Sequence, residues 1–380
     1  DDWLEALNDG LSVSACFLDI SKCFDSINHT ILLHKLKRYG IRNMEYSWFK
    51  SYLSNRKLMV RLNNSMSEAQ ELKIGVPQGS ILGPILFLLY ENDLSSWVHP
   101  GLANLYADDA LLYAYGNSLK ESSSNLQYSV NSASSWYEGN RLGLNGKKCE
   151  CMNITYKLDK DHNVISINGN IINETDSTKY LGLMFDNDLS FKEHVNYITN
   201  KCKGRLVVLR RLKSYLGKDT LKKIYKICIE PIMDYCSTVW GQSSKSNRDQ
   251  MQRIQNTAGR IITGNFDCIN YRGSEIINNL GWQSFDVRLR YYTAVLSYKA
   301  VHNLVPNYLS DLLTFQCDVH DYPTRSAQSD LLNVPDFRIS KYKESFKYNG
   351  AILWNSLPIE LRHLPNVTQF KKGYKELYYR

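Results

Sequence analysis

The chain has 380 residues, of which 43% are hydrophobic and 22% charged, and its formal net charge is +8. This length predicts two or three domains, each with a sizeable core. The longest apolar run, residues 85–90, is too short to cross a bilayer, and no signal-peptide pattern is present, so we expect no membrane association. Nine scattered cysteines without zinc spacing predict reduced thiols and therefore an intracellular protein.

Short apolar segments and helical periodicity alternate from the start of the chain. Residues 13–19 have the pattern of a buried strand that ends at Asp19. Residues 31–39 keep one apolar helical face, and Gly40 can end that helix. Residues 58–62 and 72–74 predict a hairpin that turns at residues 63–65, and Pro84 suits the first turn of a buried helix.

Two adjacent acids, Asp108 and Asp109, follow Tyr106-Ala107 at the predicted tip of a β-hairpin. Burying such a pair would cost roughly several kcal/mol unless a cation compensates, so the pattern indicates a metal site. A second anionic group must come from elsewhere, and Asp19, 89 residues earlier, is the candidate. Taken alone, Asp19 fits a helix cap or a surface acid better.

The remaining elements change character along the chain. A helix is predicted over residues 118–139, and Asn168-Gly169 predicts a tight hairpin turn. From about residue 190 apolar residues recur every three or four positions until Gly264, which predicts a helical segment. Residues 266–380 continue with helical spacing and proline-punctuated pieces. The fold class is therefore α+β followed by helices.

The positive charge is concentrated in the predicted helical segment. Residues 196–265 hold 14 of the 46 Lys and Arg but only 4 of the 38 Asp and Glu, a net +10. The rest of the chain holds 32 basic and 34 acidic residues. One reading is a solvated helical face; the better one is a surface that neutralises nucleic-acid phosphates.

Five blocks in order resemble the conserved motifs of reverse transcriptases. Residues 17–25 look like motif A, residues 75–84 like motif B and residues 106–109 like motif C. Residues 142–148 are similar to motif D and residues 179–182 to motif E. The resemblance is strongest to the reverse transcriptases of non-LTR (LINE-type, jockey-like) retrotransposons. Two departures are Cys23, where the family usually has Ala, and Cys149, where Thr commonly follows the motif D lysine.

The resemblance implies a right-hand polymerase with an antiparallel palm sheet, a helical thumb and a mainly helical C-terminal region. Its expected bounds are residues 1–189 for the palm with partial fingers, 190–265 for the basic thumb and 266–380 for a region of unknown role. The implied activity is RNA-directed DNA synthesis from dNTPs on a primer and an RNA template. Because a fingers region and an endonuclease are absent from this sequence, we expect it to be part of a larger polyprotein or a truncated copy.

The resemblance also assigns roles to individual residues. In-line phosphoryl transfer uses two divalent ions, expected here as Mg²⁺ with Mn²⁺ as the alternative. Asp19 and Asp108 are the expected metal ligands, and Asp109 is a weaker one because neighbouring strand residues face opposite ways. Lys148 matches the motif D lysine, a candidate acid for the leaving pyrophosphate. The expected nucleotide and template contacts are Ile20, Phe24 as the steric gate against a 2′-hydroxyl, Gln78, Gly79 and Tyr106.

Patterns alone leave other interpretations open. Phe24 is more often a core residue than a gate, and Pro77-Gln78-Gly79 would otherwise be a simple turn. Asp25 is expected to organise its turn rather than to bind metal. The alternative functions are a catalytically inactive nucleic-acid-binding module, acting through residues 196–265, and a structural remnant.

Overall fold

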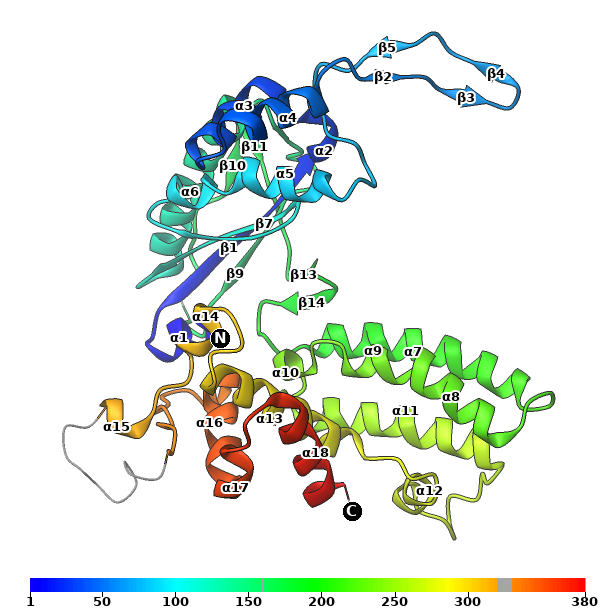
Figure 1. The fold of residues 1–380 in the computed structure, drawn as a ribbon. Helices are drawn as coiled ribbons and strands as arrows, with labels where there is room; N and C mark the ends of the chain where they lie inside the picture. Colours follow the sequence, from blue (N-terminus) through cyan, green and yellow to red (C-terminus); the bar gives the residue numbers. More distant parts are fainter. Residues whose placement is uncertain (159, 320–329, 380) are drawn as a thin grey trace. The chain divides into compact units, whose positions relative to one another are not determined.

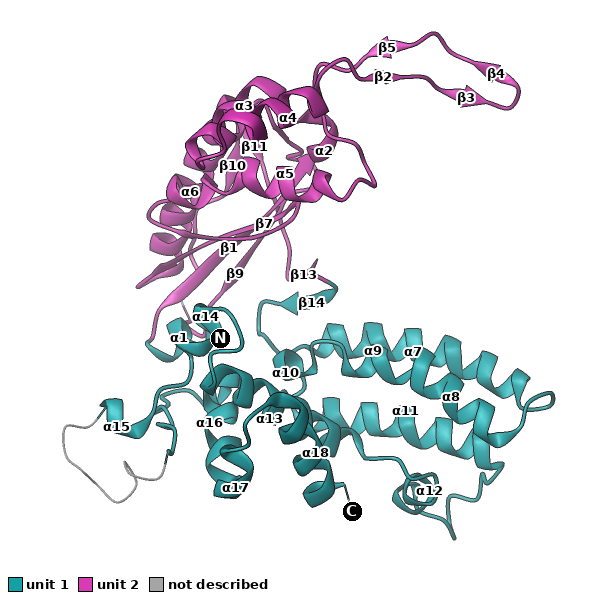
Figure 2. Ribbon diagram, viewed as in Figure 1, with its two compact units in different colours: residues 1–9, 182–380 teal, residues 10–181 magenta. Residues whose placement is uncertain are grey.

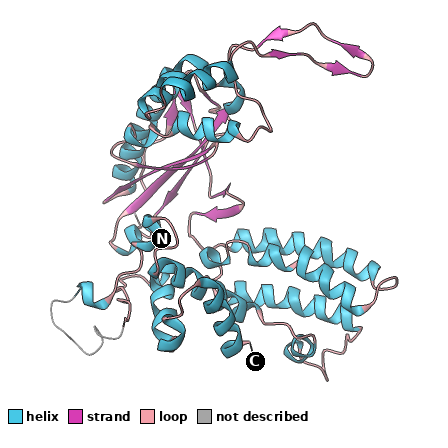
Figure 3. Cartoon of the chain, in the orientation of Figure 1, coloured by secondary structure: helices cyan, strands magenta, loops and turns pink. Residues whose placement is uncertain are grey.

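The computed structural model describes residues 1–158, 160–319 and 330–379, and it divides into two compact units (Figure 2). We call residues 10–181 the sheet unit, and residues 1–9 with 182–380 the helical unit. Mixed strands and helices are followed by helices (Figure 3), so the α+β class expected from the sequence is confirmed. Residues 159, 320–329 and 380, parts of the predicted domains, lie outside the described residues.

A mainly antiparallel sheet forms the centre of the sheet unit (Figure 1). Its order is β12-β9-β1-β7-β6, and the short β8 also pairs with β1. The apolar segment predicted around residues 13–19 is the central strand, where both faces are covered. The bounds are β1 (Ser12–Ser21), β6 (Leu102–Tyr106), β7 (Asp109–Gly116), β8 (Gly143–Leu144), β9 (Glu150–Ile154) and β12 (Asn173–Glu174).

Helices pack against this sheet through apolar side chains. α6 crosses β1 and β7, and α5 packs on α2 and α3. Gly40, at φ 92°, follows the end of α3, and Pro84 lies in the first turn of α5, as expected. The bounds are α2 (Cys23–Ser26), α3 (His29–Arg38), α4 (Asn43–Leu53), α5 (Leu82–Glu91), η1 (Leu94–Ser96) and α6 (Leu119–Gly139).

Short hairpins complete the sheet unit. The expected Asn168-Gly169 turn is confirmed, since both residues have positive φ between β10 (Ser166–Ile167) and β11 (Asn170–Ile171). The predicted turn at residues 63–65 is confirmed, since Asn63 has φ 53° and Leu62 pairs with Ser65. The predicted return strand at residues 72–74 is wrong, because the pairing residues are 65–66 and 70–71. The remaining strands are β2 (Lys57–Leu58), β3 (Arg61–Leu62), β4 (Ser65–Met66), β5 (Gln70–Glu71) and β13 (Ser177–Tyr180).

The first of two cores in the helical unit lies around its long helices. α7 and α11 pack side by side, and Gly264 ends α11 in the left-handed conformation. Apolar residues at three- and four-residue spacing, such as Val195, Ile198 and Cys202, face this core. The bounds are β14 (Leu183–Asp186), α7 (Lys192–Leu212), α8 (Lys218–Cys228), α9 (Glu230–Asp234), α10 (Ser237–Trp240), α11 (Lys245–Thr263) and α12 (Gly273–Asn279).

A second core of the helical unit lies between α13, α16 and α18. The N-terminal helix contacts α16 beside this core, where the Glu5 carboxylate accepts from Lys347 Nζ at 2.6 Å. No helix of the described residues is long and apolar enough to span a bilayer. The bounds are α1 (Asp2–Asn8), α13 (Phe285–Val301), α14 (Asn307–Ser310), α15 (Gln316–Val319), η3 (Ser340–Glu344), α16 (Phe346–Ser356), α17 (Ile359–Arg362) and α18 (Val367–Tyr378).

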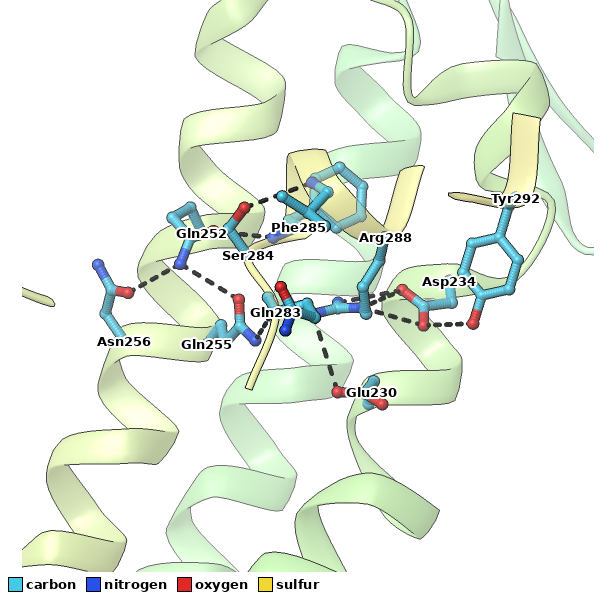
Figure 4. Close-up of polar contacts among 11 residues, drawn as sticks. Glu230, Asp234, Gln252, Gln255, Asn256, Gln283, Ser284, Phe285, Arg288 and Tyr292 are labelled. Carbon is cyan, nitrogen blue, oxygen red and sulfur yellow. Dashed lines mark hydrogen bonds and ion pairs between the residues drawn. The ribbon is translucent and has the colours of Figure 1, made fainter. Parts of the chain in front are cut away.

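A buried arginine connects α13 with α9 (Figure 4). The Arg288 side chain is 7% exposed, and its Nη2 lies 3.0 Å from an oxygen of Asp234. Its Nη1 lies 3.8 Å from Glu230, and the Tyr292 hydroxyl donates to Asp234 at 3.0 Å. A buried cation with two carboxylates and a hydroxyl around it fixes how these helices pack.

Candidate active site

Strand pairing brings two of the predicted acids together. In the β1–β7 ladder Asp19 is the register partner of Asp109, and residues directly opposite in a sheet point to the same face. Asp108 precedes Asp109 in the two-residue turn between β6 and β7, where Ala107 has φ 52°. Asp108 and Asp109 are exposed, so the expectation that the hairpin tip buries its acids is wrong.

The charges of these acids affect one another. The pKa of Asp109 is raised, first by desolvation and then by the negative charges of Asp108 and Asp19. Like charges placed opposite each other destabilise a sheet, and a cation among them would remove that cost. Within residues 1–158, 160–319 and 330–379, no three His, Cys, Asp or Glu side chains form a metal-ligand group. Mg²⁺ binds through one or two carboxylates and keeps its waters, so this donor set fits it.

The motif D loop contacts the backbone of Asp19 at the end of β1. The Asn145 amide donates to the Asp19 carbonyl oxygen at 2.8 Å, and the Asp19 amide lies 3.4 Å from the Cys149 sulfur. β8 pairs Leu144 with Ile20, which fixes the same loop to β1. Lys148 lies on this loop and is exposed.

A cavity of about 450 Å³ opens beside the acid turn. The ring of Phe24 lines it, is half-buried and lies 5.2 Å from the Phe87 ring. Ile20, Gln78, Gly79 and Asp108 also line it, so five of the predicted site residues share one cavity. The full lining is Ile20, Lys22, Cys23, Phe24, Pro77, Gln78, Gly79, Pro84 and Asp108.

The loop of residues 75–80 is fixed against the α2 turn. Gln78 Nε2 donates to both carboxylate oxygens of Asp25, at 2.9 and 3.0 Å. The Val76 amide donates to the Phe24 carbonyl at 2.9 Å. Gly75 has φ 81°, and a Cβ there would lie 2.8 Å from the Asp25 carbonyl oxygen, so only glycine allows this approach.

The structure separates some predicted residues from the cavity and adds others. Asp19, Asp109, Tyr106 and Lys148 do not line it. Lys22 and Cys23 do, and sequence reasoning had given neither a role. The position of Lys22 in the sequence, between Asp19 and Phe24, could have indicated that it lies at the site.

Cys23 contacts the acid turn directly. Its thiol donates to an Asp108 carboxylate oxygen at 3.5 Å. Burial, followed by the charge of Asp108, raises the pKa of the Cys23 thiol to about 12. The thiol therefore stays protonated and able to donate at neutral pH.

Comparison with known proteins agrees with this geometry. Residues 5–185 match the family model described as reverse transcriptase (RNA-dependent DNA polymerase). The chain is 32% identical over 303 residues to the probable RNA-directed DNA polymerase from transposon BS of Drosophila melanogaster, covering 77% of this chain and 33% of that protein. Residues 5–185 belong to the reverse transcriptase family, and the chain is similar to polymerases of non-LTR retrotransposons. The matched segment contains the motif A, B and C blocks, which carry Asp19, Gln78 and Asp108.

Other reverse transcriptases are similar over comparable lengths. The RNA-directed DNA polymerase from mobile element jockey of Drosophila funebris is 28% identical over 271 residues, covering 69% of this chain and 29% of that protein. The chain thus spans about a third of the length of these relatives. A telomerase structure from Candida tropicalis superposes with a TM-score of 0.38 at 13% identity, over 76% of this chain and 49% of that one.

Proposed function

We propose that this chain is the polymerase core of an RNA-directed DNA polymerase, which extends a DNA primer with dNTPs on an RNA template. One observation carries the proposal: the register partners Asp19 and Asp109 meet next to Asp108, which lines the same cavity as Phe24 and Gln78. A cavity with carboxylates, an aromatic ring and an amide offers groups for metal, sugar and base. The family match supports the same activity.

In this proposal Asp19, Asp108 and Asp109 hold Mg²⁺, with Mn²⁺ as a substitute. When bound, the two ions would activate the primer 3′-hydroxyl and stabilise the charge of the leaving pyrophosphate. The Cys23 thiol orients Asp108 through its hydrogen bond. The pKa of Asp109 is raised by desolvation and then by the charges of Asp108 and Asp19, and a bound cation would offset both effects.

Residues that line the cavity, together with Tyr106 and Lys148 outside it, would bind the substrates. Phe24 sits against the sugar and excludes a 2′-hydroxyl by steric clash, while Ile20, Gln78, Gly79 and Tyr106 contact nucleotide and template. Lys148 protonates or neutralises the pyrophosphate. Lys22 adds a positive charge beside Asp108, suited to a triphosphate oxygen.

We propose the domain roles that the motifs imply. Residues 1–189 act as palm with partial fingers, residues 190–265 as a basic thumb that binds backbone phosphates, and residues 266–380 have no assigned role. The concentration of positive charge in residues 196–265 supports the thumb assignment. The RNA template and dNTPs place the activity inside the cell, in the cytoplasm and nucleus.

The decisive variant is Asp108→Ala in the protein that carries this chain. We expect primer extension with Mg²⁺ to fall by at least about 10³-fold, because two-metal transfer depends on this carboxylate, while RNA affinity changes little. Asp9→Ala, an exposed acid of the helical unit, is the control and should leave extension unchanged. Undiminished extension by Asp108→Ala would refute the metal assignment. Absent extension with intact RNA binding in the unmodified protein would favour the non-catalytic nucleic-acid-binding module.

A further inference from the structure

One end of the helical unit displays apolar side chains to solvent. The loop of residues 264–272 connects α11 to α12, beside the turn that joins α7 to α8 (Figure 1). In this loop Phe266 is 52% exposed, Ile269 94% and Tyr271 47%. Soluble proteins seldom leave neighbouring large apolar groups in water without a use for them. This loop therefore has the character of an interaction surface.

Two cations from α7 and the turn after it flank the exposed ring. The Arg210 guanidinium lies 5.9 Å and Lys213 Nζ 5.5 Å from the Phe266 ring centroid. Both distances fall within the range of cation–π attraction. We call Arg210, Lys213, Phe266 and Ile269 the tip patch; it joins a half-exposed aromatic ring with positive charge.

The loop is held in shape by its own polar groups. Arg260 Nη1 donates to the Asp267 carbonyl at 3.0 Å, and Nη2 donates to the Tyr271 carbonyl at 2.9 Å. The Asp267 carboxylate accepts the amides of Ile269 and Asn270 at 2.9 and 3.0 Å. A loop fixed in this way loses less conformational entropy when its exposed ring binds a ligand.

We propose that the tip patch binds single-stranded nucleic acid, with an unpaired base stacked on Phe266 and the adjacent phosphates neutralised by Arg210 and Lys213. Nucleobases stack on aromatic rings regardless of sequence, and basic side chains beside the ring attract the backbone. A duplex offers phosphates but keeps its bases stacked on one another, so it would use the cations and not the ring. RNA and DNA single strands share this chemistry.

This inference extends the proposed polymerase function by naming an unpaired strand as a ligand of the helical unit, and it is measured by binding alone. We would titrate the 380-residue chain against fluorescent single-stranded RNA and DNA oligonucleotides and follow the anisotropy. Phe266→Ala should weaken binding by about 5- to 150-fold, the range for one stacked base, and Phe266→Trp should retain it. Tyr308→Ala, which removes an even more exposed ring on α14 (71% against 52% for Phe266), is the control and should have no effect.

An abasic oligonucleotide of the same length and charge isolates the stacking contribution. On it, Phe266→Ala and the unmodified chain should bind alike, because no base is available to stack. The double variant Arg210→Gln/Lys213→Gln should lower the salt slope of single-strand binding by about 1.4, the value for two lost phosphate contacts.

Equal losses for Phe266→Ala on normal and abasic strands, or on single strands and duplex, would overturn the stacking site. An unchanged affinity of Phe266→Ala, with an unchanged thermal melting curve, would also overturn it. Loss of primer extension by Asp108→Ala is independent of these results, so the failure of one proposal is distinguishable from the failure of the other.

Discussion

The side-chain amide of Gln78 bridges both carboxylate oxygens of Asp25 at 2.9 and 3.0 Å, which joins the motif B loop to the turn that carries Phe24. Gln78 and Phe24 line the same cavity. The pair therefore sets where two cavity side chains stand relative to each other, although Asp25 itself does not line the cavity. We interpret Asp25 as a positioning residue for Gln78.

Asp25→Ala should raise the KM for dNTP by about 5-fold and change kcat little. The substitution removes the exposed hydrogen bonds that orient Gln78, which contribute about 1 kcal/mol to dNTP binding. Single-nucleotide incorporation at varied dNTP measures both constants. The double variant Asp25→Ala/Gln78→Ala should match Gln78→Ala alone. Additive effects of the two substitutions would show that Asp25 acts by another route.

Lys22→Ala should weaken dNTP binding by about 10-fold at low salt, because it removes a positive charge from the cavity beside Asp108. Lys22→Arg should preserve most of the affinity, and added salt should narrow the difference. Equilibrium nucleotide binding, followed by fluorescence, provides the measurement. Lys73→Ala, an exposed lysine of the same unit, is the control, and an equal loss there would contradict a specific role for Lys22.

Because the Glu91 carboxyl is buried, we expect the stability of the sheet unit to depend on pH. The side chain is 1% exposed; one oxygen accepts from the Tyr137 hydroxyl at 2.8 Å, and the other has no hydrogen-bond partner among the described residues. Burial raises the pKa of this carboxyl to about 7. The unfolded chain releases the proton near its ordinary value of 4.5, so stability falls as the pH rises from there to about 7.

Glu91→Gln should remove that dependence and stabilise the sheet unit by about 3 kcal/mol at pH 8, with little difference from the unmodified chain at pH 4. Hydrogen exchange of amides in β1 and α6, read across this pH range, measures the effect. The exposed Glu360→Gln is the control. A parallel pH profile in Glu91→Gln and the unmodified chain would reject the prediction.

Arg288→Met should destabilise the helical unit by about 3–5 kcal/mol, because it leaves the carboxylates of Asp234 and Glu230 buried without their cation. Chemical denaturation followed through α13 amides tests this. Lys372→Ala, whose partner Glu376 lies 3.8 Å away on the surface, should cost less than about 1 kcal/mol. Equal costs would show that burial does not matter for the Arg288 contacts.

The sequence predicted those parts of the fold that depend on local chemistry. Asn168-Gly169 and Gly264 adopt the positive φ that their turns require, and the period of α6 follows from its apolar face. Asp19 and Asp108 were expected to share a metal site, but the antiparallel pairing of β1 with β7 was not predicted. The exact partner did not follow: Asp109, expected to be the weaker ligand, is the residue opposite Asp19.

Features that depend on tertiary packing were not predictable from patterns. The Asp25–Gln78 contact joins residues 53 positions apart through a loop whose path depends on Gly75. The burial of Glu91 and its contact with Tyr137 of α6 depend on tertiary packing, which the sequence of α5 alone does not indicate. The return strand of the β2–β5 hairpin was misplaced because residues 65–71 lack apolar alternation and pair through the backbone.

The exposure of the cysteines allows the tip patch to be labelled with a dye. Cys268 is exposed two residues beyond Phe266, whereas Cys16, Cys23, Cys149, Cys151 and Cys202 are buried with raised pKa values and react slowly with alkylating reagents. Replacing the exposed Cys236 and Cys317 with serine would leave Cys268 as the preferred attachment point for a maleimide dye. Binding of an oligonucleotide at Phe266 would then change the fluorescence emission of that dye.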